Sequence, residues 1–347
     1  MTQSSIKDIA QALGISIGTV DRALHGRARI SSETRARVLA KVEQLGYRPN
    51  IAARSLKLNR RFRVGVYFPR HTASFFDPLR DGVRAAASET SGANVELVFR
   101  TFPRLGEGDV ELLTADLDQK FDGILIAPGN PTRIEPLLRK LDRKGVPIVC
   151  VADDCPRSKR LSSVSADAFT CGAVAAELFS RALHTSGHVA AITGTLAILD
   201  HSEKMRGFAE TLAALAPSLT MLPPTESHGK PAEAYRQTKK LLARNPLPLG
   251  IYVSTANSLP VLRALSERGL LGKISLITAD IFPELYPYIQ SGQILATLNQ
   301  RPFTQGKAAL ELLLRFLIHG IEPKLVNRFN PHIVMRSNLA LFSKEEA

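Results

Sequence analysis

Short polar side chains follow several apolar, strand-like runs of this 347-residue chain. Carboxylates, amides and hydroxyls exchange hydrogen bonds with hydroxyl groups, and an aromatic ring can stack on the CH face of the same molecule. This combination suits a small polyhydroxylated ligand, such as a sugar or a polyol. The residues expected to contact it are Phe75, Phe76, Asp154, Asp167, Ser254, Asn257, Asp280 and Gln300.

Alternating strands and helices are expected to hold these side chains. The strand-like runs are residues 62–68, 94–102, 122–128, 146–152, 188–194, 249–255, 274–280 and 294–300. The helical patterns are 78–90, 108–120, 134–144, 170–183, 204–215, 232–244, 258–268, 282–291 and 304–319. This order predicts an α/β fold with parallel sheets in two groups, separated near residues 153–168. Ligands of such sheets lie beyond the carboxyl ends of the strands.

Structural roles stay open for several of these residues. Phe75 and Phe76 could be core residues, Asp167 could cap the helix that starts near Thr170, and Asp280 could cap the helix after it. His184, His188, His201 and His228 lack the spacing of metal ligands. Cys150, Cys155 and Cys171 show no CxxC spacing, so we expect small buried hydrophobic residues. We therefore predict no metal site and no cofactor.

Positive charge is concentrated at the start of the chain. Residues 1–63 hold 13 Lys and Arg against 4 Asp and Glu, a net charge of +9 out of +13 for the whole chain. A polyanionic partner such as nucleic acid is indicated, because phosphate contacts supply the sequence-independent part of binding. A membrane surface would attract the same charge, but the wide apolar face of an interfacial helix is missing. A solvated basic face remains the structural alternative.

The same region predicts three short helices. Ile6, Ile9, Ala10 and Leu13 form one apolar face, and Gly14 ends that helix. Ser16 is a suitable cap for a second helix over 17–24, and a third is expected over 32–45 with Val38, Leu39, Val42 and Leu45 inward. Two short helices joined by a glycine-containing turn form a helix-turn-helix unit, whose second helix enters the major groove of DNA.

The sequence from IKDIAQALGIS to GYRPN and the following AARSLK resembles the DNA-binding headpiece of the lactose-repressor (LacI/GalR) family. The resemblance implies that the segment after Pro49 folds as a hinge helix on DNA and that Leu56 wedges into the minor groove. Asp21, Gly18 and His25 depart from the residues usual in the family, so the operator sequence is not predicted. The implied DNA-contacting residues are Ser16, Ile17, Gly18, Thr19, Arg22, His25, Arg29, Ser31, Thr34, Asn50, Ala53 and Leu56.

The rest of the chain is similar to the sugar-binding fold that this family shares with ribose-type periplasmic binding proteins. The stretches SFFDPLRDG, DGILIAPGNP, HSEKMRGF and ITADIFPELYPYI carry this resemblance. It implies that Phe76 stacks on the ligand and that Asp280 and Gln300 hold its hydroxyls. Lys204 stands where the family commonly has arginine, so a point charge replaces a bidentate clamp. Ala152 stands where sugar binders often have aspartate, which leaves Asp153 and Asp154 as substitutes.

We therefore expect a cytoplasmic transcriptional regulator, most simply a repressor, that senses a carbohydrate-like effector. The expected parts are a headpiece (1–49), a hinge and linker (50–61) and a two-lobed sensor (62–347). A homodimer is expected on palindromic operator DNA, because one short recognition helix reads few base pairs. An activator, a co-repressor-dependent regulator with a non-sugar effector, and a sugar-acting enzyme remain alternatives.

Two other classes of protein have little support in the sequence. No GxSxG, Walker A or GxGxxG motif is present, and no nucleophile is paired with a base, so no catalytic residue is assigned. A transport-type binding protein would need a secretory signal, and the first thirteen residues lack an apolar core for one. No run of about 18 apolar residues suggests a membrane span.

Overall fold

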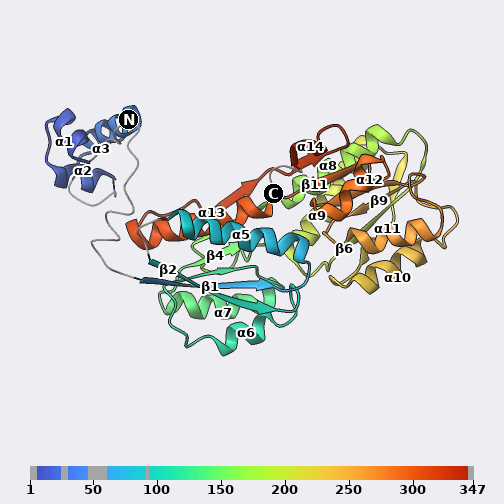
Figure 1. Ribbon diagram of the computed structural model, residues 1–347, viewed down its shortest axis with the longest axis horizontal. Helices are drawn as coiled ribbons and strands as arrows, with labels where there is room; N and C mark the ends of the chain where they lie inside the picture. Colours follow the sequence, from blue (N-terminus) through green and yellow to red (C-terminus); the bar gives the residue numbers. More distant parts are fainter. Residues whose placement is uncertain (1–5, 25–29, 46–60, 91–93, 343–347) are drawn as a thin grey trace.

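The computed structural model describes residues 6–24, 30–45, 61–90 and 94–342 (Figure 1). Three helices form the headpiece: α1 (Ile6–Leu13), α2 (Ile17–Leu24) and α3 (Ser32–Gln44). Ile9, Val20 and Val38 are fully buried between them. The predicted helices are thus confirmed, but the expected inward position of Leu39 is wrong, because 45% of that residue is exposed.

The first lobe of the body is a six-stranded sheet with two layers of helices. Its elements are β1 (Arg61–Pro69), α5 (Ala73–Glu89), β2 (Asn94–Phe102), α6 (Asp109–Ala115), β3 (Gly123–Ile126), α7 (Pro131–Arg143), β4 (Ile148–Val151), β5 (Ser162–Ala166), α13 (Pro302–His319) and β12 (Val326–Phe329). The strand order is β12-β5-β4-β3-β1-β2, and every pairing is parallel. Helices α5 and α13 cover one face, and α6 and α7 cover the other (Figure 1).

The second lobe repeats this plan. Its elements are α8 (Ala168–Ala182), β6 (Gly187–Thr193), α9 (Leu199–Leu215), β7 (Leu219–Met221), β8 (Thr225–Glu226), α10 (Pro231–Leu241), β9 (Gly250–Val253), α11 (Ser258–Glu267), β10 (Ser275–Ala279), the 3-10 turn η1 (Pro283–Leu285), α12 (Tyr286–Gln290), β11 (Ala296–Asn299), β13 (His332–Val334) and α14 (Leu339–Phe342). The order is β13-β11-β10-β9-β6-β7, with β8 paired to β6 and only β13 antiparallel. The predicted doubly covered α/β fold is confirmed.

The division between the lobes differs from the simple break expected near 153–168. Strand β5 lies inside that stretch and belongs to the first sheet, so the chain crosses to the second lobe only at α8. Helix α13 and strand β12 then return to the first lobe, and β13 crosses back. The sequence SSVSA hid β5, because its buried serines satisfy their hydroxyls on neighbouring carbonyls and need no apolar side chain.

Two helices begin five residues earlier than predicted. Helix α5 starts at Ala73 and contains Pro78, although proline usually marks a first turn. Helix α9 starts at Leu199, so one helical turn lies ahead of Lys204. Both extensions matter for function, because the added turns face the space between the lobes.

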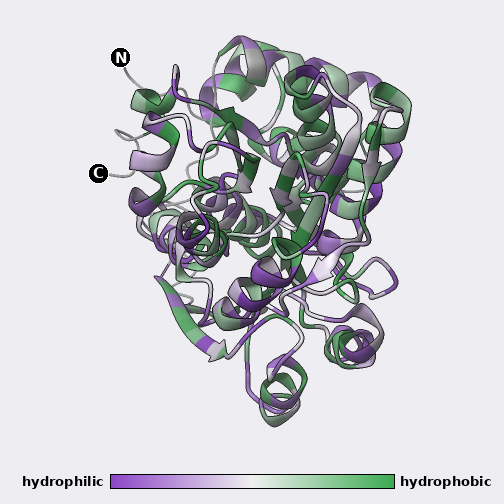
Figure 2. Cartoon of the chain, turned by 90° about the vertical axis from the view of Figure 1, so that its right-hand side faces the viewer, coloured by the Kyte–Doolittle hydropathy of each residue, from purple (hydrophilic) through white to green (hydrophobic). Residues whose placement is uncertain are grey.

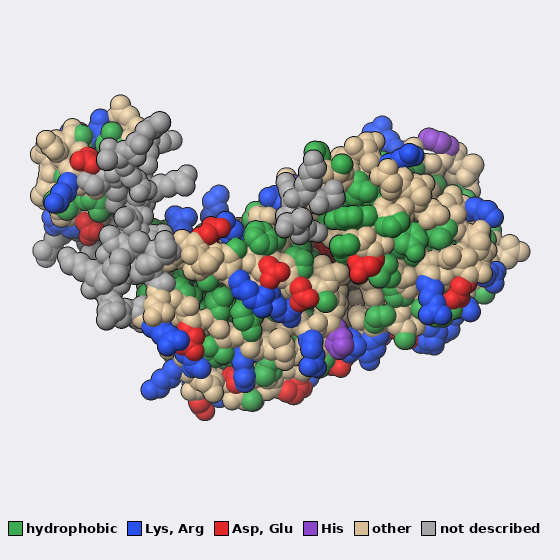
Figure 3. Space-filling model, in the orientation of Figure 1, with side chains coloured by type: hydrophobic (Ala, Val, Ile, Leu, Met, Phe, Trp, Pro, Cys, Tyr) green, Lys and Arg blue, Asp and Glu red, His purple; other side chains and the backbone are tan. Residues whose placement is uncertain are grey.

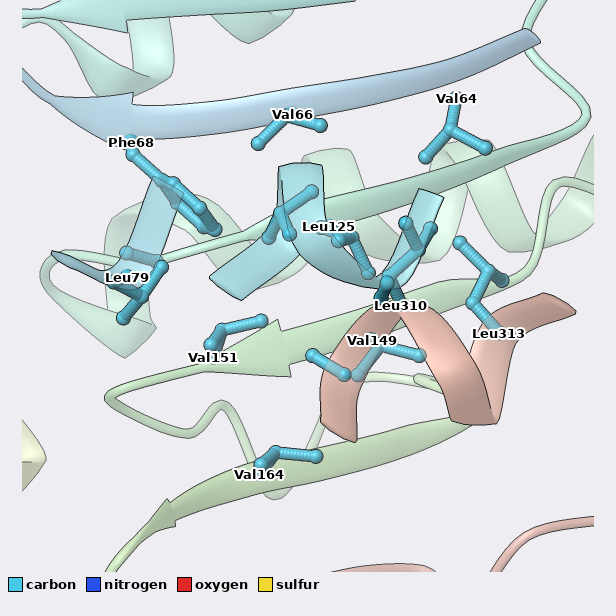
Figure 4. Packing of buried hydrophobic residues seen from close by; sticks show 14 of the residues in the cluster. Val64, Val66, Phe68, Leu79, Leu125, Val149, Val151, Val164, Leu310 and Leu313 are labelled. Atoms are coloured by element: carbon cyan, nitrogen blue, oxygen red, sulfur yellow. The ribbon is translucent and has the colours of Figure 1, made fainter. Parts of the chain in front are cut away.

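Strands of both sheets are buried on their two faces. In Figure 4, Val64, Val66, Phe68, Val149 and Val151 meet residues of α5 and α13. These five side chains are no more than 1% exposed. Figure 2 shows the same pattern as green strands inside helices that are purple on their outer sides. Burial of such surface stabilises each lobe by roughly 25 cal/mol per Å² of apolar area.

Glycines set the spacing of one helix pair in each lobe. A Cβ on Gly82 or Gly306 would lie 2.0 Å from a backbone oxygen of the partner helix, α13 or α5. Gly172 of α8 and Gly207 of α9 have the same relation, with hypothetical contacts of 1.9 and 2.1 Å. The oxygen that Gly172 meets is the carbonyl of Lys204. Close backbone contact between α8 and α9 therefore fixes the turn that carries Lys204.

Replacing Gly172 by alanine should lower the free energy of unfolding. Alanine in an open helix is more stable than glycine by about 1 kcal/mol, but here its methyl group must displace α9, at a cost of about 1–3 kcal/mol. Urea unfolding of Gly172→Ala measures the balance, with Ser180→Ala in the same helix as a control expected within about 0.5 kcal/mol of wild type. Unchanged or increased stability of Gly172→Ala would contradict the close approach.

Candidate functional site

A cleft lies between the lobes, at the carboxyl ends of strands from both sheets. Its position is the one expected for a ligand of parallel α/β sheets. Seven of the nine residues predicted to meet a ligand line it: Phe75, Phe76, Lys204, Ser254, Asn257, Asp280 and Gln300.

A buried chain of polar contacts forms one wall of the cleft. The Lys204 ammonium donates to Asp200 Oδ2 at 2.6 Å and to Gln300 Oε1 at 2.7 Å. The Gln300 side-chain amide donates to Asp280 Oδ2 at 2.8 Å, and its backbone N–H donates to Asp280 Oδ1 at 3.1 Å. Lys204, Gln300 and Asp280 are therefore held by one another before a ligand arrives.

Charges in this wall are tuned by burial and by their neighbours. Burial raises the pKa of Asp280 to about 6, although Lys204 and the Gln300 hydrogen bonds oppose the shift. Burial lowers the pKa of Lys204 and is the largest single effect, but the charge and hydrogen bond of Asp200, together with Cys171 and Asp280, outweigh it and raise the pKa. The ammonium ion can stay buried because its ion pair with Asp200 offsets the loss of contact with water.

Other polar groups at the cleft are buried and have no partner among the described residues. They are Asp153 Oδ2, Thr255 Oγ1 and Asn257 Nδ2. Such atoms are uncommon in folded proteins, because a buried polar group without a hydrogen bond costs about 1–3 kcal/mol. A ligand with several hydroxyl groups could satisfy all three, since a hydroxyl both donates and accepts.

An aromatic pair lies opposite, at the start of α5. The rings of Phe75 and Phe76 are 5.0 Å apart and meet edge to face at 81°. Both residues belong to the core of the first lobe and also line the cleft, so a role in core packing does not exclude a role in binding. Their position depends on the early start of α5.

Two hydrogen bonds cross the cleft. Asp153 Oδ1, after β4, accepts from the backbone N–H of Asp200 in the first turn of α9 at 3.0 Å. Arg104 Nε donates to the carbonyl of Gly229 at 3.4 Å. Burial and the nearby Asp200 raise the pKa of Asp153 well above its usual value. One carboxyl group thus joins the lobes, and its second oxygen is buried beside the cleft without a partner among the described residues.

Left-handed backbone conformations gather at this site. Among the described residues, the non-glycine positions with positive φ are Thr72, Ala152, His228, Asp280 and Arg301. The first four line the cleft, and Arg301 follows Gln300. Such conformations cost roughly 1–3 kcal/mol each and persist where the surroundings enforce them.

Asp154 and Asp167 do not line this cleft; they line an adjoining pocket that shares Ala152, Asp153 and Asp200 with it. Asp154 is an ion-pair partner of Arg160 and also accepts from Ser163. Asp167 caps α8 by accepting from the Thr170 N–H at 2.9 Å, and it pairs with Arg328. The sequence offered the cap at Thr170 as an alternative role for Asp167, but it did not indicate the two arginine partners. Conversely, Asp200 and Thr255 are cleft residues that it did not single out.

The headpiece presents a second candidate site on the first turn of α2. Ser16 caps this helix, with its Oγ accepting from the Thr19 N–H at 3.1 Å. Ile17 is 48% exposed, and a Cβ on Gly18 would make only ordinary van der Waals contacts, with Ser16 at 3.8 Å and Arg22 at 3.9 Å. Arg22 is exposed, with its Nε donating to the Gly18 carbonyl at 3.0 Å. The terminal nitrogens of its guanidinium group therefore remain for another partner.

A similar cap begins α3, where Ser31 Oγ accepts from the Thr34 N–H at 3.1 Å. Hydroxyls and helix N-termini of this kind contact DNA phosphates. The other residues predicted to contact DNA, His25, Arg29, Asn50, Ala53 and Leu56, lie outside the described residues. On the two lobes, Figure 3 shows basic and acidic side chains interspersed.

Metal and thiol chemistry find no support in the described part of the chain. No group of three or more His, Cys, Asp or Glu side chains there could hold a metal ion. Cys150, Cys155 and Cys171 are buried, which raises the pKa of each thiol. No helix of these residues is long and apolar enough to cross a membrane.

Comparison with known families accounts for both sites. Residues 64–320 match the periplasmic binding protein domain, and residues 5–50 match the lacI family of bacterial regulatory proteins. The chain belongs to the periplasmic binding protein domain family over most of its length, and it carries a lacI-family headpiece in front of that domain. The regulator therefore combines a DNA-binding headpiece with a two-lobed sensor domain.

Its relatives are named as regulators and not as enzymes. Catabolite control protein A of Priestia megaterium is 28% identical over 77% of this chain and 78% of its own. The transcriptional repressor PurR of Aliivibrio fischeri is 27% identical over 97% and 98%. The ribose operon repressor of Bacillus subtilis is 27% identical over 90% and 91%.

Solved structures with the same fold are binding proteins. GanP, a glucose-galactose binding protein from Geobacillus stearothermophilus, is 23% identical with a TM-score of 0.73, over 81% of this chain and 99% of its own. A solute-binding protein from Agrobacterium vitis, bound with alpha-D-tagatopyranose, is 21% identical with a TM-score of 0.75, over 82% and 98%. At this identity the likeness establishes the fold of the two lobes.

The raised pKa of Asp280 should make stability depend on pH. Between the ordinary aspartate value and about 6, the folded state holds a proton that the unfolded chain has released. Asp280 therefore stabilises the fold at low pH, and this contribution of about 2–3 kcal/mol is lost as the pH rises from about 4 to about 6. Urea unfolding at each pH should show this loss in wild type relative to Asp280→Asn.

Asp118→Asn is the control, because Lys144 lowers the pKa of that exposed carboxyl group instead of raising it. This variant should keep the loss of stability between pH 4 and pH 6. A constant stability difference between wild type and Asp280→Asn across this range would contradict the assigned shift.

Proposed function

We propose that the regulator is a repressor whose affinity for operator DNA is controlled by a neutral, polyhydroxylated effector, such as a sugar or polyol, in the cleft. The observation that carries this proposal is the set of unpartnered polar atoms of Asp153, Thr255 and Asn257. These buried atoms lie in the same cleft as two phenylalanine rings. Hydroxyl groups and a CH face are what such a surface recognises.

Each part of the cleft then has a role. Asp153 Oδ2 accepts from one effector hydroxyl, Asn257 Nδ2 donates to another, and Phe76 stacks on the ring. Lys204 and Gln300 orient Asp280, and the N–H groups that they do not use for this purpose donate hydrogen bonds to the effector. The Lys204 charge is balanced within the wall by Asp200, so the ligand need not carry a compensating charge. Solute-binding proteins of the same fold from Burkholderia graminis and Bacillus halodurans, bound to D-arabinose and myo-inositol, support this class of molecule.

Effector binding would act on DNA through the orientation of the lobes. Asp153 and Arg104 reach from the first lobe to α9 and Gly229 of the second. A ligand that touches both lobes favours one orientation, and residues 50–61 would pass it on as a hinge. In a homodimer on palindromic DNA, the changed orientation of the lobes alters the spacing of the two headpieces. Operator DNA as the partner implies a cytoplasmic location.

Sugar binding should be sensitive to the acceptor oxygen of Asp153. Thermal-shift titration of the full chain with glucose, galactose, arabinose, ribose, tagatose and myo-inositol identifies a ligand, because binding to the native state raises its stability. Asp153→Asn replaces a carboxyl oxygen by an NH2 group and should weaken binding of that ligand at least about tenfold, the effect of roughly 1.4 kcal/mol. Asp116→Asn, at another buried carboxyl group of the first lobe, should bind normally.

The same ligand should change operator affinity, and operator DNA should change ligand affinity by the same factor. Fluorescence anisotropy of labelled DNA, with and without the sugar, measures one side of this coupling, and calorimetry measures the other. If none of these molecules binds, or if a bound sugar leaves DNA affinity unchanged, the proposed control is wrong.

Arg22 is the residue proposed to read a base. Arg22→Ala should reduce affinity for the specific operator by about 5- to 150-fold, since a bidentate arginine–guanine pair contributes about 1–3 kcal/mol. Arg181→Ala removes an equal charge from a 79% exposed side chain of the second lobe and should leave binding unchanged. Anisotropy with operator and with random DNA separates the cases: an equal loss on both would assign Arg22 to phosphate contact.

A further inference from the structure

The cleft continues at one end into a wider groove. The two spaces share His71, Thr72, Gly229, Ala256 and Asn257. Its walls come from different lobes, with the start of α5 on one side and helices α10 and α11 on the other. A ligand in the cleft would therefore meet open, walled space at this end instead of bulk surface.

Apolar and aromatic groups line that groove. Leu259, in the first turn of α11, is 39% exposed although it lies beside the partly buried rings of Tyr235 and Tyr288. The Tyr235 hydroxyl donates to Glu267 at 2.5 Å, and the Arg263 guanidinium lies 4.9 Å from its ring centre. Tyr235 is thus fixed in place, as a side chain must be when it offers a rigid surface to a ligand.

We propose that the effector is longer than one sugar ring: an oligosaccharide or glycoside whose first ring fills the cleft and whose second ring or aglycone lies in this groove. The inference rests on the proposed function, since it extends the same site. Continuity supports it, because Thr72, Ala256 and Asn257 line both spaces. A single ring would leave the apolar surface around Leu259 in water.

The groove also gives a longer effector more influence on the lobes. Its first ring contacts Asp153 and Phe76 near the centre of the cleft, whereas its second would touch Thr72 and Ser74 of the first lobe and Leu259 of the second. A ligand shifts an equilibrium only by its different affinity for the two states. Contacts far from the centre of the cleft change most when the lobes move, so the outer ring would add to this difference.

Calorimetric titration of the full chain with matched one-ring and two-ring probes tests the proposal. Glucose is compared with maltose and cellobiose, galactose with lactose and melibiose, and each monosaccharide with its p-nitrophenyl glycoside. We expect at least one two-ring probe to bind about tenfold or more tightly than its own monosaccharide. Equal or weaker binding of every two-ring probe, with a monosaccharide bound normally, overturns the proposal and leaves the proposed function intact.

Groove variants locate the second ring. Leu259→Ser changes an exposed side chain and should leave the thermal midpoint nearly unchanged. It should reduce the advantage of the two-ring probe to threefold or less, and it should leave monosaccharide affinity as in wild type. Asp153→Asn should weaken both probes alike. An unchanged two-ring advantage in Leu259→Ser overturns the assignment, and no binding of any sugar, whatever its length, overturns the proposed function as well.

Discussion

The buried ammonium group of Lys204 is the constraint on which the cleft depends. A lone charge at 2% exposure would be costly, so the group needs Asp200 one turn earlier on α9 and Gln300 after β11. Gln300 in turn holds both oxygens of Asp280. One requirement thus links α9 to the ends of two strands. The glycine contact between Gly172 and the Lys204 carbonyl fixes the same helical turn from behind.

This arrangement explains why one wall of the cleft is held by hydrogen bonds while other polar atoms at the cleft have no partner among the described residues. The contacts of Lys204 and Asp280 are made within the second lobe, so they survive any movement between lobes. Asp153 differs, because one of its oxygens bonds to the other lobe and the second has no partner. Different residues therefore do these two jobs. The bonded side chains of Lys204 and Asp280 preserve the shape of the site, and the unpaired oxygen of Asp153 can gain a hydrogen bond when a ligand binds.

Periodicity predicted most of the fold, and the positions of side chains at strand ends predicted much of the site. Apolar runs identify β1, β3 and β4 because parallel strands are buried on both faces. Strand β5 was not predicted, because it contains serines in place of an apolar run. Their hydroxyls donate to carbonyls that lie nearby only in the folded chain. Asp154 and Asp167 follow strands, as Asp280 does, but each forms an ion pair with an arginine. Arg160 lies in the loop after Asp154, and Arg328 is far from Asp167 in the sequence. Such pairings depend on tertiary contacts that local pattern does not contain.

Few hydrogen bonds between the described residues cross the cleft, and this suits a molecular sensor. Across the cleft, Asp153 and Arg104 each contribute one hydrogen bond, and a bond of this kind is worth about 0.5–1.5 kcal/mol net. Allosteric coupling between sites typically needs about 1–3 kcal/mol, a similar amount. A ligand that satisfies Asp153 Oδ2, Thr255 and Asn257 at once could supply that energy. The strained backbone at Thr72 and Asp280 is held by the lobes themselves, so the site keeps its form while their orientation changes.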